Sequence, residues 1–143
     1  MSEEKARAIV KERAGGVCEA AIANVCFGHH DSTHHRRKQR YRDTQWAASN
    51  LIATCGSGTT GCHGYIEANP KWAMSQGLWL TEAEDPREVS VYMRWGQIYA
   101  KSWWALDDEG MLEHDGGEFE PVMLSPAVRD FFSPPTSFTR SSR

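Results

Sequence analysis

The sequence predicts an α+β fold, in which a small zinc-stapled core follows one helix and precedes a small β-rich subdomain. Three observations predict it. A charged amphipathic segment opens the chain, four cysteines in two pairs bracket a histidine-rich segment, and apolar and polar residues alternate from about residue 88 onward. A chain of 143 residues is long enough for one domain, or for a small domain with an appended subdomain.

The first predicted element is an amphipathic helix of about three turns that begins after Ser2 and stops before Gly15. Ser2 can cap the helix, and Glu3 and Glu4 place negative charge in its first turn, where the helix dipole favours it. Glycine at the other end provides a stop. We expect this helix to pack against the core and to take no part in chemistry.

The four cysteines predict a structural zinc site. Cys18 and Cys26 have seven residues between them, and Cys55 and Cys62 have six. The chain shows no apolar leader and no apolar run long enough to cross a bilayer, so we expect a cytoplasmic protein. In that reducing compartment cysteines bind metal more often than they form disulfides. The alternative is four unrelated buried cysteines.

The segment between the cysteine pairs, residues 29–50, contains few apolar residues and predicts strand, turn, and strand or loop rather than helix. A helix is expected next, from about Thr60 to Ala68, and Pro70 limits its extension.

Two strings in this region carry a resemblance: THHRRKQRYR, residues 33–42, and SNLIATCGSGTTGCHGYIEANP, residues 49–70. Together they hold a His-His dyad, one Asn between the cysteine pairs, and a Cys-His step that opens the predicted helix. This ordered set resembles the HNH family of metal-dependent nucleases, in the zinc-stapled form common among phage-encoded endonucleases. The resemblance implies a ββα-metal core within an HNH nuclease domain at residues 1–76.

The resemblance also implies residue roles. His34 matches the first metal ligand, and His35 matches the general base. Asn50 matches a loop Asn that would bond to backbone and hold the base in place, and His63 matches the ligand on the helix. Glu67 lies one turn after His63, where similar sequences commonly carry a histidine; a carboxylate there favours Mg²⁺ or Mn²⁺. A solvated surface glutamate is the alternative for Glu67.

The dyad raises a geometric question. Adjacent residues on a regular strand point to opposite faces. His34 and His35 can therefore share a site only if the strand ends, bulges or twists there. A second dyad, His29 and His30, is the alternative catalytic pair, and His114 is expected to be merely exposed.

The net charge of −3 is unevenly distributed. Residues 1–72 hold ten Lys and Arg against seven Asp and Glu, whereas residues 73–143 hold six against twelve. A polyanion such as DNA would be attracted to the first half and repelled by the second. The basic excess directly follows the dyad, and we interpret it as a phosphate clamp rather than a solvated face: Arg36, Arg37, Lys38, Arg40 and Arg42.

Residues 77–132 predict the β-rich subdomain, and residues 133–143 a disordered tail. Strands are expected over about 88–95 and 97–106, from 111, and over 119–124, followed by a short helix from Ser125 to Phe132. Four tryptophans fall in this half, and we expect core packing rather than stacking on bases: Trp79, Trp95, Trp103 and Trp104.

The leading hypothesis is a metal-dependent endonuclease that hydrolyses DNA phosphodiester bonds, with structural Zn²⁺ and a catalytic Mg²⁺ or Mn²⁺. One divalent ion and one neutral imidazole can activate water, stabilise charge at phosphorus and assist the leaving oxygen. Similar phage nucleases work alongside the packaging terminase, so the resemblance implies that partner, and no membrane. The alternatives are a catalytically inactive zinc-stapled nucleic-acid-binding module, and an assembly protein whose β-rich half binds another protein.

Overall fold

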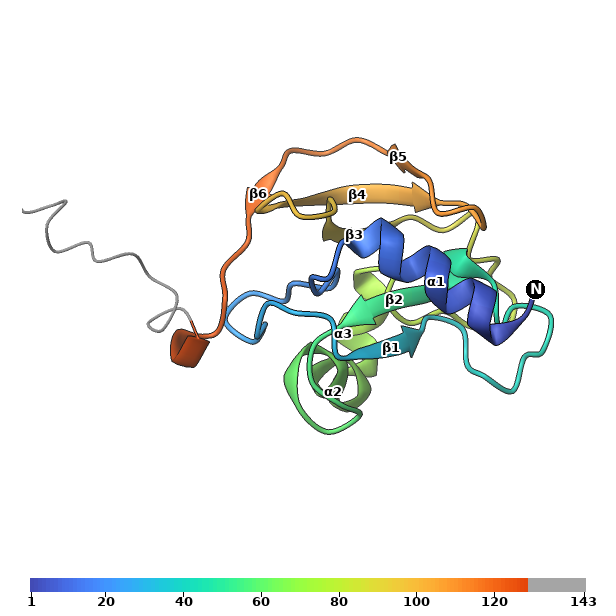
Figure 1. The fold of residues 1–143 in the computed structure, drawn as a ribbon, viewed down its shortest axis with the longest axis horizontal. Helices are drawn as coiled ribbons and strands as arrows, with labels where there is room; N and C mark the ends of the chain where they lie inside the picture. The colour runs from blue at the N-terminus through green and yellow to red at the C-terminus, as the bar shows by residue number, and fades with distance from the viewer. Residues whose placement is uncertain (129–143) are drawn as a thin grey trace, which may run out of the picture.

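The computed structural model describes residues 1–128 and has the predicted α+β composition. The predicted tail at 133–143 and the end of the helix expected up to Phe132 lie outside the described residues. No helix within residues 1–128 is long and apolar enough to span a membrane. Figure 1 shows the elements, which are α1 (Glu3–Ala14), β1 (Ser32–His35), the 3₁₀ turn η1 (Ala48–Asn50), β2 (Leu51–Thr54), α2 (Gly61–Ala68), α3 (Pro70–Ser75), β3 (Val91–Arg94), β4 (Ala100–Leu106), β5 (Leu112–His114) and β6 (Glu120–Pro121).

Helix α1 forms where its capping residues predict. The Ser2 side chain accepts a hydrogen bond from the Lys5 N–H, and Gly15 ends the helix with a φ of 66° while its N–H donates to the Lys11 carbonyl. A left-handed C-terminal residue of this kind is where glycine is favoured. The buried face of α1 lies on β2 and η1, as expected for a packing element.

The described strands form two antiparallel sheets. In the smaller sheet β1 pairs with β2, so that His34 lies opposite Ile52 and His35 opposite Leu51. In the larger sheet the order is β3-β4-β5, with β6 also paired to β4. In the view of Figure 1 the larger sheet lies above the β1–β2 pair and α2 lies below it. The predicted strands are present with shorter bounds. A turn at Gly96 separates β3 from β4, and the strand expected over 119–124 is confined to Glu120–Pro121.

The two halves of the sequence share one hydrophobic core. Ile52 and Ile66 from the first half lie in the same buried cluster as Met93 and Leu106 from the second. Residues 77–128 therefore cover the first half rather than forming a separate globule. Trp104 is only 4% exposed, whereas Trp95 is 47% exposed, so the expectation of core packing is right for Trp104 and wrong for Trp95.

A buried ion pair ties α1 to this core. The Arg13 Nε and Nη2 atoms donate to the two Glu19 carboxylate oxygens at 2.7 Å each, with both side chains fully buried. Removing one partner leaves the other charge buried and unpaired. We expect Glu19→Ala to lower the free energy of unfolding by about 3–5 kcal/mol in chemical denaturation.

The matched control is Glu3→Ala, which breaks the exposed pair between Glu3 and Arg7. An exposed pair contributes about 0–1 kcal/mol, so this variant should unfold nearly as the parent does. Equal losses in Glu19→Ala and Glu3→Ala would contradict the importance of the buried pair.

Candidate metal centres

All four cysteines converge, as predicted. Their sulfur atoms lie within 4.8 Å of one another, all four side chains are buried, and none forms a disulfide. Two come from the segment between α1 and β1, and the others lie directly after β2 and in the first turn of α2. A tight turn brings the last two together, because Gly56 and Gly61 both have positive φ and a Cβ on Gly56 would lie 2.2 Å from the Thr60 carbonyl oxygen. The cluster could hold a zinc ion.

Backbone N–H groups support negative charge on these sulfurs. The donors lie 3.2–3.3 Å from a sulfur atom and belong to Ile22, Phe27, Gly28 and Cys62. Hydrogen bonds from the other thiols and from the Phe27 N–H lower the pKa of Cys55, whereas hydrogen bonds to the Cys18, Cys26 and Cys55 sulfurs raise the pKa of Cys62. Thiolates with such donors are the form in which cysteine binds zinc. The donor set therefore fits a structural tetrathiolate site.

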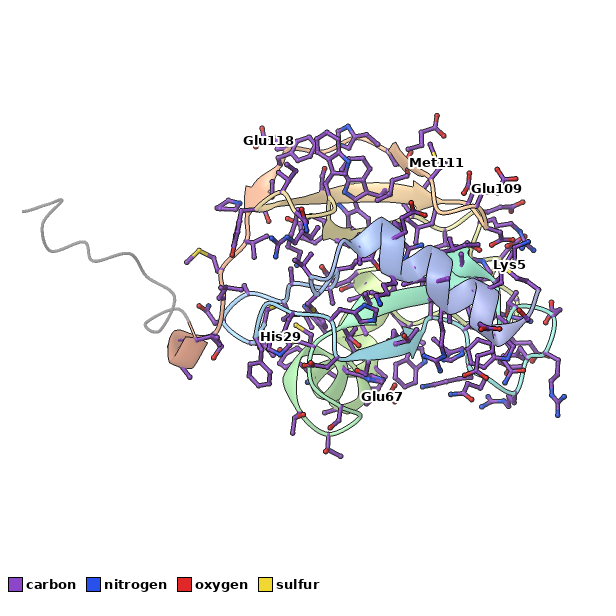
Figure 2. All side chains as sticks on the ribbon, viewed as in Figure 1. Lys5, His29, Glu67, Glu109, Met111 and Glu118 are labelled. Atoms are coloured by element: carbon purple, nitrogen blue, oxygen red, sulfur yellow. The ribbon has the colours of Figure 1, made fainter. Side chains whose placement is uncertain are left out.

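A second cluster joins β1 to α2. His34 Nδ1 lies 3.4 Å from Glu67 Oε2, and His63 Nε2 lies 3.8 Å from the same oxygen. His63 and Glu67 are four residues apart on α2 and so share one helix face. Glu67 lies at the edge of the molecule beneath the β1–β2 pair, so the cluster faces solvent on one side (Figure 2).

The hydrogen bond on the far side of His34 fixes its tautomer. His34 Nε2 lies 2.6 Å from the Leu78 carbonyl oxygen, which can only accept, so Nε2 carries the proton. In the neutral ring, Nδ1 then presents a lone pair toward Glu67, and it has no hydrogen-bond partner within residues 1–128. Two acceptors that face each other at 3.4 Å repel unless a proton or a cation lies between them.

His63 is oriented in the same way. Its Nδ1 lies 2.8 Å from Ser32 Oγ, and that hydroxyl in turn donates to the Gly56 carbonyl at 2.9 Å. The His63 Nδ1–H therefore donates to Ser32, and its Nε2 lone pair points toward Glu67. Outer hydrogen bonds that aim imidazole lone pairs at one point are typical of metal sites.

The charges and distances of this cluster suit a divalent cation. A hydrogen bond from His34, whose proton then lies between the two facing acceptors, and nearby Lys38 lower the pKa of Glu67 to about 2, so its carboxylate is ionised. Burial lowers the pKa of His63, which favours the neutral imidazole. Ligand atoms about 2.1 Å from one ion lie on the order of 3–3.5 Å apart, close to the spacings seen here.

His35 lies outside this cluster. Regular pairing continues through His35, which sits opposite Leu51, so the two histidines of the dyad point to opposite faces of β1. The His35 ring packs edge-on against Trp46 with 5.1 Å between ring centroids. Its Nε2 is buried and has no hydrogen-bond partner within residues 1–128. Burial, with smaller contributions from His34 and Arg7, lowers the pKa of His35 to about 4.

Asn50 bonds to backbone, as the resemblance implies. Its Oδ1 accepts from the Arg37 N–H at 2.7 Å, and its Nδ2 donates to the carbonyls of Arg37 and Thr44. Asn50 is fully buried, and these bonds fix the chain where it leaves β1. They therefore hold the strand end that carries His35.

The prediction that Arg36 contacts phosphate is wrong. Its side chain is fully buried, and its guanidinium donates to the carbonyls of Ser49, Gly77, Pro86 and Val89. Arg37 is similarly committed, because it donates to the Glu82 carbonyl and pairs with Asp43. The irregular segment from residue 77 to 90 has few strand partners for its carbonyls, and the guanidinium groups satisfy them.

The rest of the basic run reaches the surface. Arg40 and Arg42 are exposed. Lys38 Nζ lies 3.3 Å from Glu67 Oε1 and 3.6 Å from the centroid of the Trp79 ring, which places a cation beside the histidine cluster. Three of the five predicted basic residues thus remain available to a phosphate backbone.

The other histidines join neither cluster. His29 pairs with Asp31 near the surface, and neither His29 nor His30 belongs to a group of three potential ligands within residues 1–128. His114 is exposed, as expected, and it also stacks on Phe119.

Sequence reasoning missed Ser32 and the Leu78 carbonyl, which set the two imidazole tautomers. A hydroxyl two residues before His34, on the same strand face, was the one available signal for Ser32.

Scans against family models and searches of curated proteins and of solved structures find no match for this chain.

Proposed function

We propose that this protein is an HNH-type endonuclease that hydrolyses DNA phosphodiester bonds, with a divalent ion held by His34, His63 and Glu67. In this proposal β1, β2 and α2 form a ββα-metal core, and zinc at the four cysteines stabilises it. The observation that carries the proposal is the convergence of two imidazole lone pairs on one carboxylate. These three side chains stand on the elements and in the order that the resemblance to HNH nucleases implies.

When bound, Mg²⁺ or Mn²⁺ would act as a Lewis acid on the scissile phosphate and its leaving oxygen. Lys38 would add positive charge next to the phosphate from its position beside Glu67. Its side chain is 28% exposed, so it could contact a bound strand without a rearrangement of the fold.

His35 is the proposed base. It is neutral near pH 7 because its pKa is lowered. Within residues 1–128, no hydrogen-bond donor occupies the lone pair of its Nε2. A buried nitrogen without a partner calls for an explanation, and an attacking water would provide one. Because β1 ends at His35, a phosphate lying across the strand end could meet the metal on one side and this imidazole on the other.

The exposed arginines next to the cluster should set the salt dependence of DNA binding. Replacing Arg40 and Arg42 together by alanine should lower the slope of log affinity against log salt by about 0.9 for each phosphate that the variant no longer neutralises. Fluorescence anisotropy with a labelled duplex at several salt concentrations measures the slope.

Arg87→Ala is the control for this comparison. Arg87 is also exposed but pairs with Asp85 and Asp108 in the acidic half of the chain, so its removal should leave the slope unchanged. An unchanged slope in the Arg40/Arg42 variant would remove both residues from the DNA interface.

The test of the proposal is nicking of supercoiled plasmid by zinc-loaded protein with Mg²⁺, with Mn²⁺ and with EDTA. We expect nicking with either metal and none with EDTA. Binding without nicking under all three conditions would favour the alternative, an inactive zinc-stapled nucleic-acid-binding module. Function in a reducing cytoplasm alongside a phage packaging terminase belongs to the same proposal, and the terminase rests on the resemblance alone.

A further inference from the structure

Lys101 is a buried cation on β4, far along the chain from the cysteines. The residue is 8% exposed, and its Nζ donates to the Ala21 carbonyl oxygen at 3.0 Å and lies 4.8 Å from the centroid of the Tyr92 ring. It is absent from the salt bridges formed within residues 1–128. A buried ammonium without a counter-charge is strongly unfavourable. Glu120 lies opposite Lys101 across the β4–β6 pair, but it is exposed and accepts a hydrogen bond from the Tyr92 hydroxyl. A buried negative group close to Lys101 is therefore needed to explain its position.

The peptide group between Ala21 and Ile22 supplies the connection. Its carbonyl accepts from Lys101, and its N–H donates to Cys62 Sγ at 3.3 Å. One peptide thus joins the ammonium to a zinc-site sulfur, and hydrogen bonds in series polarise one another. Ala21 has a φ of 42°, a left-handed conformation that a residue other than glycine adopts only when its surroundings enforce it.

The zinc site would provide a buried counter-charge. Four thiolates around one divalent cation leave a net charge of about −2, and all four cysteine side chains are buried. Burial lowers the pKa of Lys101, and the charges of Cys62, Cys18, Cys26 and Glu120 act in the opposite direction. The geometric link between the ammonium and the sulfurs is the Ala21–Ile22 peptide, which bonds to both Lys101 and Cys62.

We propose that Lys101 is part of the zinc centre, balancing the charge of the tetrathiolate through the Ala21–Ile22 peptide and making zinc affinity depend on the C-terminal sheet. The inference rests on zinc at the four cysteines and is independent of nuclease activity. It gives the β-rich half a role, because β4 carries a residue that the metal centre of the first half needs.

The experiment compares zinc affinity, by competition with a chromophoric chelator, in the full-length parent, Lys101→Met, Lys101→Gln and the control Lys71→Gln. Lys71 is exposed on α3, so its variant should match the parent. Removal of an outer-shell partner typically weakens metal binding about 10–100-fold, and we expect that weakening in both Lys101 variants. The glutamine variant keeps a donor for the carbonyl without the charge, so it also covers the case in which the methionine variant fails to fold.

Absorption of the cobalt-substituted protein provides a second readout. The thiolate-to-cobalt charge-transfer bands should shift in Lys101→Gln and stay unchanged in Lys71→Gln. Parent-like zinc affinity and parent-like cobalt spectra in Lys101→Gln would overturn the inference while leaving the zinc site intact. A folded parent that binds no zinc would overturn the zinc site and this inference together, and it would leave plasmid nicking as a separate question.

Discussion

Replacing Cys62 by serine is expected to unfold the protein rather than merely slow its chemistry. Cys62 is fully buried in the main core. Its sulfur accepts a hydrogen bond from the Ile22 N–H, and its own N–H donates to the Cys55 sulfur. Structural zinc supplies on the order of 10 kcal/mol of folding free energy. The whole free energy of unfolding of a domain is about 5–15 kcal/mol, so losing one ligand removes a large part of it.

Circular dichroism and elemental analysis of the purified variant measure this effect. We expect Cys62→Ser to lose helical signal and bound zinc together. Ser57→Ala, an exposed change in the same loop, should keep both. A Cys62→Ser protein that retains its fold and melting temperature would show that the four cysteines are ordinary core residues.

The second large effect is expected from His35→Ala. A positioned base contributes about 10²–10⁴-fold to the rate, so cleavage should fall by that factor at saturating metal. The affinity for metal should stay nearly unchanged, because His35 is not one of the clustered ligands. Single-turnover cleavage of a labelled duplex at several Mn²⁺ concentrations separates the two quantities.

His30→Ala is the matched control, since it removes an imidazole from the other dyad. We expect it to cleave as the parent does. The reverse pattern, with His35→Ala active and His30→Ala inactive, would place the chemistry at His29 and His30 and would require a different metal site.

The parts of the fold that depend on neighbouring residues could be predicted from the sequence. Ser2 and Gly15 bound α1 because capping is a local interaction, and alternation of apolar residues located β3. The arrangement of the cysteines as two pairs along the sequence predicted the four-sulfur cluster, because zinc ligands come in pairs on turns. The spacing of His63 and Glu67 predicted one helix face from helix geometry alone.

The parts that depend on distant segments could not. A basic run beside a histidine dyad is typical of an exposed segment. The Arg36 side chain is nevertheless buried, and it donates to carbonyls that lie up to 53 residues later in the chain. The tautomer of His34 depends on the Leu78 carbonyl, which no motif indicates. Whether the strand stays regular through His35 depends on its pairing with β2, so the separation of the dyad onto two faces became visible only in the fold.

The most direct test of the central claim is plasmid cleavage as a function of Mn²⁺ concentration by zinc-loaded parent and by His63→Ala and Glu67→Gln. Both variants remove a proposed ligand and leave His35 in place. We predict saturable cleavage by the parent, and curves displaced to higher Mn²⁺ in both variants, with activity partly restored at excess metal. Superimposable curves for all three proteins, or a folded parent that never cleaves at any Mn²⁺ concentration, would contradict the claim.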